Sequence, residues 1–446
     1  MKYSTLALAA ALSLATGVVS AKVPQAEADK LKGELMPLGG QKAGNGSTIP
    51  DWDGGLKKAH TTGERYTNPW PEDKPKYKIT KANLGEHKAM LSPGQLAIFE
   101  KYDTYTIPVY ETRRSTSAPD FVYEATYQNA LKAELANDGE ALKNAVTGIP
   151  FPIPSKTEGK EVIWNHKTRY RGKSVTRYNN QLAVTSGGTF TVFKLKEDVK
   201  FKYNIPNQTP EDLNNILVYF LQQTLEPARQ AGGLLLVHDT LDQVKEARRA
   251  WLYNPGQRRL RRAPNVAYDN PGTGADGLRV NDQLDVFNGA LDRYNWKVVG
   301  KKEMVVPANS FELHSDKYKY DDVADDKHLN QDLARYEVRR VWEIDANVKD
   351  GTNHVYKRRV FYVDEDNWQI VLVDIYDGRD QLWRVQEGHV AQAYDLQAIL
   401  PVAGTVYDLL ATRYLIMDLN NEDPEVVEAD FDDEYFSTSN VKKLAK

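Results

Sequence analysis

Residues 147–172, TGIPFPIPSKTEGKEVIWNHKTRYRG, gather side chains that could do chemistry. They include three alternating prolines and four residues of a predicted helix: Pro150, Pro152, Pro154, Trp164, Asn165, His166 and Arg169. A catalytic histidine needs an orienting carboxylate and a nucleophile nearby, and this segment indicates neither. We therefore predict a stiff proline strap, tied down by the polar helix residues and packed by the tryptophan. Catalysis at this place is the alternative, and no catalytic residue is predicted.

Other reactive patterns lack the context that their chemistry requires. GTGADG at residues 272–277 has the letters of a dinucleotide-binding loop, but it follows Asn270 and Pro271 instead of a strand, and no amphipathic helix comes after it. The 8 histidines have no metal-binding spacing and there is no cysteine, so neither a metal site nor a cofactor is expected. The acidic turn at residues 321–326 lacks the glycine and glutamate of a calcium loop.

Arginines recur on apolar strand faces. In residues 336–344, alternation places Tyr336, Val338, Arg340, Trp342 and Ile344 on one face. We expect a concave apolar surface with a few cations, suited to an amphiphile with an anionic head. A solvated face on which arginines stack on tyrosines is the alternative. The candidate ligand-binding residues, part of which ordinary core packing would claim, are Trp251, Tyr253, Trp296, Trp342, Tyr362, Ile375, Trp383, Arg340, Arg358 and Arg384.

Two further segments concentrate charge. RRAWLYNPGQRRLRRAP, at residues 248–264, places six arginines around a predicted turn. It is either a charged edge that prevents sheet aggregation or a patch for anionic head groups or an acidic partner surface. In residues 418–434, nine of seventeen side chains are acidic, a pattern usual for a solvated tail or loop and occasional for a contact with a basic partner.

The elements that must position these residues are mainly strands. After residue 177, strand-like segments follow one another, separated by turn signals such as Gly187-Gly188 and Asp377-Gly378. Short connections predict antiparallel meanders and a wide curved sheet. Helices are predicted at residues 25–35, 93–101, 119–136 and 158–171. The fold class is mainly β (α+β).

The order of segments predicts four parts. Residues 1–21 have the positive start, apolar run and small terminal residues of a signal peptide cleaved after Ala21, which predicts export to the periplasm. Residues 22–118 read as an extended arm with short helices, residues 119–417 as the β domain and residues 418–446 as an acidic segment. No other apolar run approaches the ~20 residues of a membrane span, so the mature chain should have none. The net charge of −4 predicts no overall electrostatic attraction to nucleic acid.

Several long segments together resemble one protein family. They are GIPFPIP with VIWNHKTRYRG, LGGQKAGNGSTIPDWDGGL, MLSPGQLAIFEKY, PVYETRRSTSAP, AWLYNPGQRRLRRAPNVAYD, DQLDVFNGALDRYNWKVVGKKEMVVPAN and RVFYVDEDNWQIVLVDIYDGRDQLWRV. The family consists of exported Gram-negative proteins of unknown function, often labelled outer-membrane lipoprotein-sorting proteins. The resemblance implies a fold like the carriers LolA and LolB: a strongly curved antiparallel sheet forming an incomplete barrel, with helices over its mouth.

The resemblance also implies partners. Such a cavity holds acyl chains by apolar burial, at ~0.8 kcal/mol per CH₂. Family members are often encoded near an RND-type exporter and an outer-membrane β protein. Our hypothesis is therefore a non-enzymatic periplasmic carrier or chaperone for a lipid or other hydrophobic cargo. One alternative is an adaptor that joins such an exporter to an outer-membrane partner through the arm and the acidic segment. A further alternative is an envelope hydrolase that uses paired carboxylates.

Overall fold

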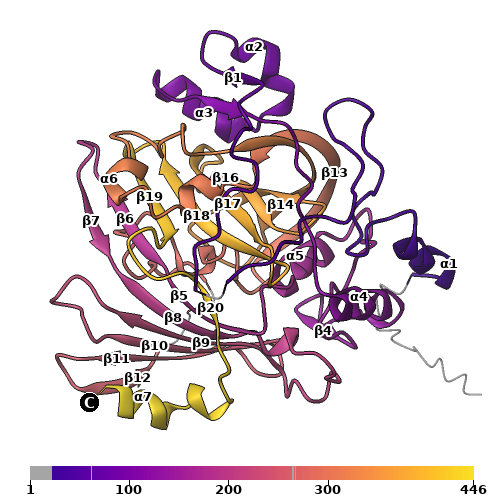
Figure 1. Ribbon diagram of the computed structural model, residues 1–446. Coiled ribbons are helices and arrows are strands. Elements are labelled where there is room, and N and C mark those ends of the chain that lie inside the picture. Colours follow the sequence, from indigo (N-terminus) through magenta and orange to yellow (C-terminus); the bar gives the residue numbers. More distant parts are fainter. Residues whose placement is uncertain (1–22, 62, 264–265, 267, 446) are drawn as a thin grey trace, which may run out of the picture.

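The structure is a computed structural model that describes residues 23–61, 63–263, 266 and 268–445. The predicted signal peptide lies outside these residues. Two large β-sheets make up most of the molecule, one above the other in Figure 1. This arrangement confirms the predicted fold class, mainly β with curved antiparallel sheets.

The larger sheet has eleven strands along an open path. In spatial order they are β1 (Tyr77–Ile79), β2 (Ile107–Val109), β14 (Tyr336–Val348), β15 (Arg358–Asp364), β16 (Ile370–Tyr376), β17 (Leu382–Ala393), β18 (Ala398–Asp408), β19 (Arg413–Leu419), β6 (Asn180–Val184) and β7 (Phe190–Phe193), while β13 (Tyr294–Pro307) pairs with β14. Its pairs are antiparallel apart from one parallel pair, Val109 with Tyr336. In Figure 1, β13 bends around one end of this sheet.

The smaller sheet has seven strands. In spatial order they are β12 (Arg259–Arg262), β11 (Arg249–Asn254), β10 (Leu234–Thr240), β9 (Ile216–Thr224), β8 (Leu195–Lys200), β5 (Ser174–Tyr178) and β20 (Val427–Glu428). The chain leaves this sheet after β5, forms β6 and β7 in the other sheet and returns at β8. The strands predicted as one wide sheet are thus divided between two, because alternation predicts a strand but not its partner. A separate pair consists of β3 (Glu134–Ala136) and β4 (Ala141–Lys143).

The helices are short. They are α1 (Gln25–Ala28), α2 (Leu84–His87), α3 (Pro93–Lys101), α4 (Asp120–Lys132), α5 (Gly159–Thr168), α6 (Tyr320–Val323) and α7 (Thr438–Leu444), with 3-10 turns η1 (Asp29–Lys32), η2 (Lys88–Met90), η3 (Lys202–Asn204), η4 (Asn281–Gln283), η5 (Phe311–His314) and η6 (Glu434–Phe436). The α3 bounds are those predicted, and the Ser92 hydroxyl caps it by accepting from the Gln95 N–H at 3.1 Å. Within the described residues, no helix has the length and apolar character needed to cross a bilayer.

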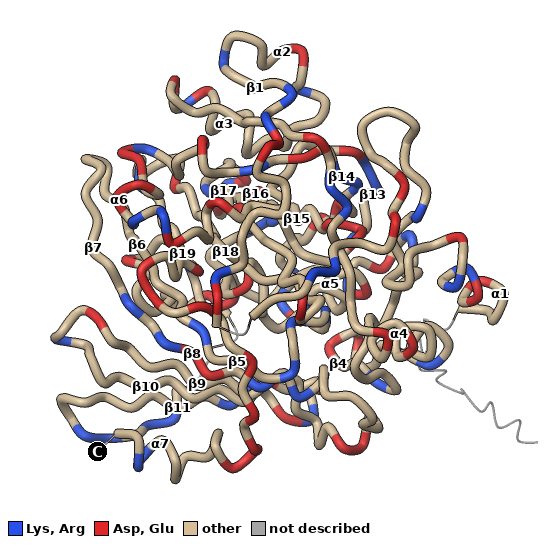
Figure 2. The backbone as a smooth tube through the Cα atoms, viewed as in Figure 1, with Lys and Arg blue, Asp and Glu red and all other residues tan. Residues whose placement is uncertain are grey.

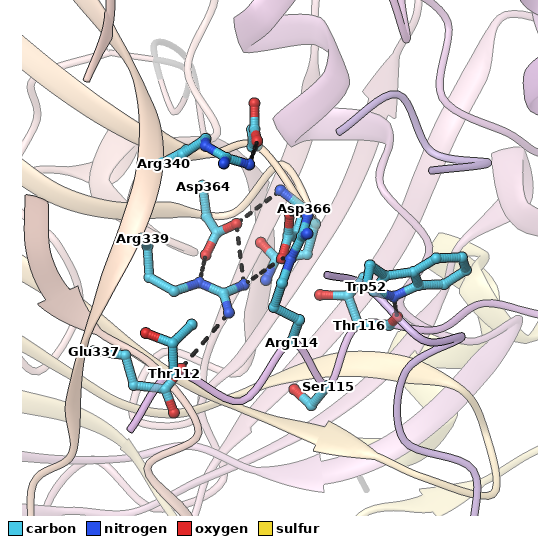
Figure 3. A network of polar contacts seen from close by, with 12 residues as sticks. Trp52, Thr112, Arg114, Ser115, Thr116, Glu337, Arg339, Arg340, Asp364 and Asp366 are labelled. Atoms are coloured by element: carbon cyan, nitrogen blue, oxygen red, sulfur yellow. Dashed lines mark hydrogen bonds and ion pairs between the residues drawn. The ribbon is translucent and has the colours of Figure 1, made fainter. Parts of the chain in front are cut away.

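The N-terminal arm is fixed to the larger sheet by a buried ion network, drawn in Figure 3. Arg114 donates to both carboxylate oxygens of Asp366, at 3.0 and 2.7 Å, and to the Gln41 carbonyl at 2.7 Å. Arg339 bridges Asp364 and Asp366, each at 2.9 Å. The charges of two arginines and two aspartates balance one another here. We therefore interpret this network as a structural contact that holds the arm on the sheet.

The acidic segment is not a solvated tail, which corrects that expectation. Glu425 is 4% exposed and pairs with His314 at 2.5 Å. Asp423 pairs with Lys194 at 2.8 Å. The chain then forms β20 and α7, and Val441 of α7 packs with Tyr253 on the smaller sheet. Four acidic residues of this segment meet basic side chains of the folded domain, which charge counting along the chain does not predict: Asp423, Glu425, Glu428 and Asp433.

Candidate functional site

A cavity of about 120 Å³ lies between the smaller sheet and residues 266–288. Its floor is one face of the smaller sheet. Cross-strand pairs share a face, and the register places Val199 beside Phe220 and Phe220 beside Val237. All three line the cavity, with Val218 and Leu235 beside them. The floor is therefore a continuous apolar surface across β8, β9 and β10.

The roof consists of residues 273–288, held from behind by the larger sheet. Arg384 on β17 donates to the Leu278 and Gly277 carbonyls, each at 2.9 Å. Arg359 on β15 makes two hydrogen bonds to Asp282, at 3.0 and 2.7 Å. Buried polar contacts with these partners fix the roof in one position. The cavity is thus a space between the two sheets.

Arg279 is the distinctive side chain of the roof. It is 4% exposed and lines the cavity, yet it forms no ion pair with any described residue. Its guanidinium donates only to two carbonyls, Thr273 at 3.1 Å and Val280 at 3.4 Å, and its Nε has no partner. Burial lowers the pKa of Arg279. A buried cation without a counter-ion is costly, so this position suits an anion that arrives from outside.

The other charged groups of the lining are paired. Asp285 accepts from Arg169 and Arg171, both at 2.5 Å. Asp239 accepts from Arg248 at 2.9 and 3.0 Å. Arg169 and Arg171 hold the pKa of Asp285 well below its usual range, against the effect of burial. Arg177 also lines the cavity and pairs with Glu197 at 2.8 Å. Arg279 is therefore the charged group of the lining that has no direct ion pair with a described residue, although the carboxylates of Asp418 and Glu197 attract it from a greater distance.

The proline strap and the following helix position this roof. The Asn165 side chain makes two hydrogen bonds to the Phe151 main chain, accepting from its N–H at 2.9 Å and donating to its carbonyl at 2.7 Å. Burial lowers the pKa of His166 to about 3, so the ring is neutral and its Nε2 donates to the Asp285 carbonyl at 2.9 Å. Trp164 is buried and donates to the Gly139 carbonyl at 2.9 Å. These contacts agree with a structural role for the strap and the helix, which stays a prediction.

Replacing Asn165 by leucine should cost about 2 kcal/mol of stability. The substitution leaves both buried Phe151 main-chain groups without partners while keeping a similar volume. Urea denaturation of the Asn165→Leu variant measures the loss. The control is Asn295→Leu at an exposed position of β13, which should change stability by no more than about 0.5 kcal/mol. Equal stability of the two variants would contradict the strap contact.

The ten predicted ligand-binding residues lie elsewhere, and none lines the cavity. Trp251 and Tyr253 are on the opposite face of the smaller sheet, in the cluster that includes α7. The two clusters that flank the larger sheet contain Trp296, Ile375 and Tyr362 as core members and Trp342 and Trp383 at their margins. Their ligand-binding role stays a prediction.

The three predicted arginines have partners within the protein. Arg358 pairs with Asp345 at 2.8 Å, and Arg340 donates to the Ala43 carbonyl of the arm at 2.9 Å. Arg384 pairs with Asp408 at 3.0 Å in addition to its roof contacts. The single face expected along β14 is also divided, because Tyr336 and Val338 pack in one core cluster and Ile344 in the other.

The sequence interpretation did not single out Arg279, Asp285 or Arg177. Arg279 lies just after GTGADG, a loop that was set aside because its context, with no strand before it and no amphipathic helix after it, does not fit dinucleotide binding. Three glycines of this loop, including Gly274 and Gly277 with positive φ, let the backbone form the irregular roof. A glycine-rich, irregular segment next to a single arginine is the local sequence signal that could have indicated a binding loop here.

A smaller cavity adjoins the main one and shares Arg171, Arg177 and Phe201 with it. Asp418 lines it, and burial raises the pKa of Asp418 to about 6. The folded state therefore binds more protons than the unfolded state between pH ~4 and 6, so stability from this group is present below pH ~4 and is lost as the pH rises through 6.

An Asp418→Asn variant should accordingly melt about 2 °C higher than the wild type at pH 7 and at the same temperature at pH 4. Calorimetry at the two pH values checks this. A variant that is less stable than the wild type at pH 7 would show that the electrostatic attraction between Asp418 and Arg177 outweighs the cost of burial.

Two open, curved sheets with an apolar, arginine-roofed cavity between them define a cavity-bearing β protein. The chain belongs to the family described as Protein of unknown function (DUF1329), whose model matches residues 78–442. This match confirms the family resemblance of the sequence. Its relative in Pseudomonas aeruginosa, Uncharacterized protein PA3922, is 48% identical over 426 residues, 94% of this chain and 93% of the relative.

Two solved structures are also similar. A DUF1329 family protein from Desulfovibrio piger is 15% identical, covers 60% of this chain and 92% of its own, and has a TM-score of 0.42. A LolA superfamily protein from Nitrosomonas europaea is 11% identical, covers 64% of this chain and 99% of its own, and has a TM-score of 0.38.

Proposed function

We propose that the protein is a periplasmic carrier that binds an amphiphile with an acidic head group between its two sheets. The observation that carries this proposal is Arg279, a buried cation without a counter-ion above an apolar floor. An anionic head group would satisfy the guanidinium, and the floor would bury the adjoining carbons. The predicted signal peptide supports the periplasmic location.

The cavity size sets what part of a ligand it holds. An apolar cavity of about 150 Å³ accommodates benzene, so about 120 Å³ holds an acidic group and its first few carbons. The rest of a chain would leave along Leu235, which lines the cavity, and its cross-strand partner Leu252, which is 48% exposed. A long-chain acid fits this path better than a compact polar solute.

Binding of this kind needs no catalytic group. A hydrolase would require a carboxylate free to exchange protons in the main cavity, and its two carboxylates, Asp239 and Asp285, are both held ionised by arginines. Asp418, whose pKa burial raises to about 6, lines the adjoining smaller cavity instead. The adaptor alternative loses the solvated acidic tail on which it relied, because that segment is folded into the domain. Carriage of a hydrophobic acid is therefore the better supported function.

Native mass spectrometry of the protein purified from its own periplasm tests this proposal. Organic extraction should release an acidic amphiphile in near-stoichiometric amount, and a fluorescent fatty-acid probe should be displaced by that extract. A protein that is empty and takes up no probe contradicts carriage. A bound molecule without an acidic group would contradict the assignment of Arg279 to the head group.

A further inference from the structure

One edge of the smaller sheet carries cations that form no ion pair with any residue that the structure describes. Strand β12 is the last strand of that sheet, and the turn before it begins the cationic run. The exposed members are Arg258, Arg259, Arg261 and Arg262. None forms an ion pair or side-chain hydrogen bond with another described residue. Figure 2 shows blue segments at this end of the sheet, close to the C-terminus.

Helix α7 adds to the same edge. The Tyr253 hydroxyl on β11 donates to the Ala445 carbonyl at 3.3 Å, which places the end of α7 beside the edge strands. Lys442 and Lys443 are exposed there and also have no ion-pair partner among the described residues. The surface formed by β12, its preceding turn and the end of α7, called the basic edge below, thus carries six unpaired cations in a chain of net charge −4.

Apolar side chains interrupt these cations. Leu252 on β11 and Leu444 on α7 are each 48% exposed. Leu252 pairs with Leu235 on one side and Arg261 on the other, so it joins the cavity floor to the basic edge. The apolar floor therefore continues to the rim of the sheet, where arginines flank it.

We propose that the basic edge docks on an anionic lipid bilayer, with the two leucines entering the interface and the cavity floor leading to it. This rests on the proposed carrier function and names the surface from which cargo is exchanged. Charge complementarity favours the bilayer, because cations near anionic lipid gain attraction and adjacent exposed leucines gain burial. An acidic protein surface would leave Leu252 and Leu444, on two different elements, without a shared apolar partner.

Co-sedimentation with vesicles tests the docking. The mature protein should bind phosphatidylethanolamine vesicles that contain phosphatidylglycerol, and binding should fall steeply with salt. A variant with Arg258→Gln, Arg259→Gln, Arg261→Gln and Arg262→Gln should bind these vesicles about 600-fold more weakly, since each cation near the surface contributes roughly fivefold. Leu252→Ser with Leu444→Ser should reduce the binding that persists at high salt.

The matched control removes four exposed, unpaired lysines from the arm. Lys57→Gln, Lys74→Gln, Lys76→Gln and Lys88→Gln change the net charge equally and should leave vesicle binding within about threefold of the wild type. Equal losses in both quadruple variants would overturn the proposal in favour of non-specific attraction. Wild-type protein that binds polyglutamate but not the vesicles would overturn it in favour of an acidic partner.

Probe uptake in solution separates this proposal from the carrier function. The arginine-edge variant should take up a fluorescent fatty acid as the wild type does, because no substituted residue lines the cavity. Vesicle binding by a protein that takes up no probe would support the basic edge and contradict carriage. A wild type that takes up the probe but does not bind vesicles would support carriage and contradict docking by the basic edge.

Discussion

An Arg279→Met variant is expected to be more stable than the wild type and to bind acidic amphiphiles at least about tenfold more weakly. Methionine fills the same space without a buried charge, and replacing buried ions by apolar residues often stabilises a protein by about 1–4 kcal/mol. The same change removes a charge-assisted contact to the head group, worth about 1.5–3 kcal/mol. Opposite signs for stability and binding are expected because the wild-type arginine is buried and forms no direct ion pair with a described residue.

Urea denaturation and probe displacement measure the two effects on one preparation. The control is Arg358→Met, which removes an arginine that is paired with Asp345 and lies outside the cavity. Its affinity should match that of the wild type. If the control loses affinity and Arg279→Met does not, the sequence prediction for Arg358 is supported and the roof assignment is wrong.

An Asp285→Asn variant is expected to lose about 3–5 kcal/mol of stability. The substitution leaves the buried guanidinium of Arg169 and the nearby one of Arg171 without their shared counter-ion. Because the arginines depress the pKa of Asp285, its stabilisation is present above the unfolded pKa of ~4 and fades as the pH falls below it. The difference between variant and wild type should therefore be largest at neutral pH and smaller in acid.

Chemical denaturation between pH 3 and 7 measures this difference. Asp345→Asn serves as the control, because it breaks the half-exposed pair with Arg358 and should cost at most about 1 kcal/mol. A difference between Asp285→Asn and wild type that does not change with pH would contradict the ionised state of Asp285.

The fold was largely predictable because local signals and tertiary structure agree. Ser92 before Pro93 predicts the start of α3, and the structure begins the helix there. Alternating residues in 336–348 predict a strand that becomes β14. The predicted helix at residues 119–136 ends earlier, at Lys132, because the chain then pairs Leu135 with Leu142 in the β3–β4 hairpin. Competition from this hairpin overrides helix propensity.

The types of side chain at the candidate site could be expected from the sequence, but which residues form it could not. Apolar strand faces with arginines were expected, and such a surface exists, formed by Val199, Phe220 and Val237 under Arg279. The sequence does not say which arginines pair with carboxylates: Arg340, Arg358 and Arg384 do, and Arg279 forms no ion pair with a described residue. Pairing depends on segments far apart in the chain, and it decides which cation is left for a ligand.

The pairing of late strands with early ones has a consequence for how the chain reaches this state. Val184 of β6 pairs with Tyr414 of β19, and Thr176 of β5 pairs with Val427 of β20. The last part of the chain therefore completes both sheets by pairing with strands that come much earlier. Contacts of such sequence separation slow folding, because loop-closure entropy is lost before they form. During synthesis, β5 and β6 emerge before β19 and β20, so one edge of each of these early strands stays unpaired until then. A holding chaperone that shields these edges until the C-terminus arrives would therefore raise the yield of folded protein.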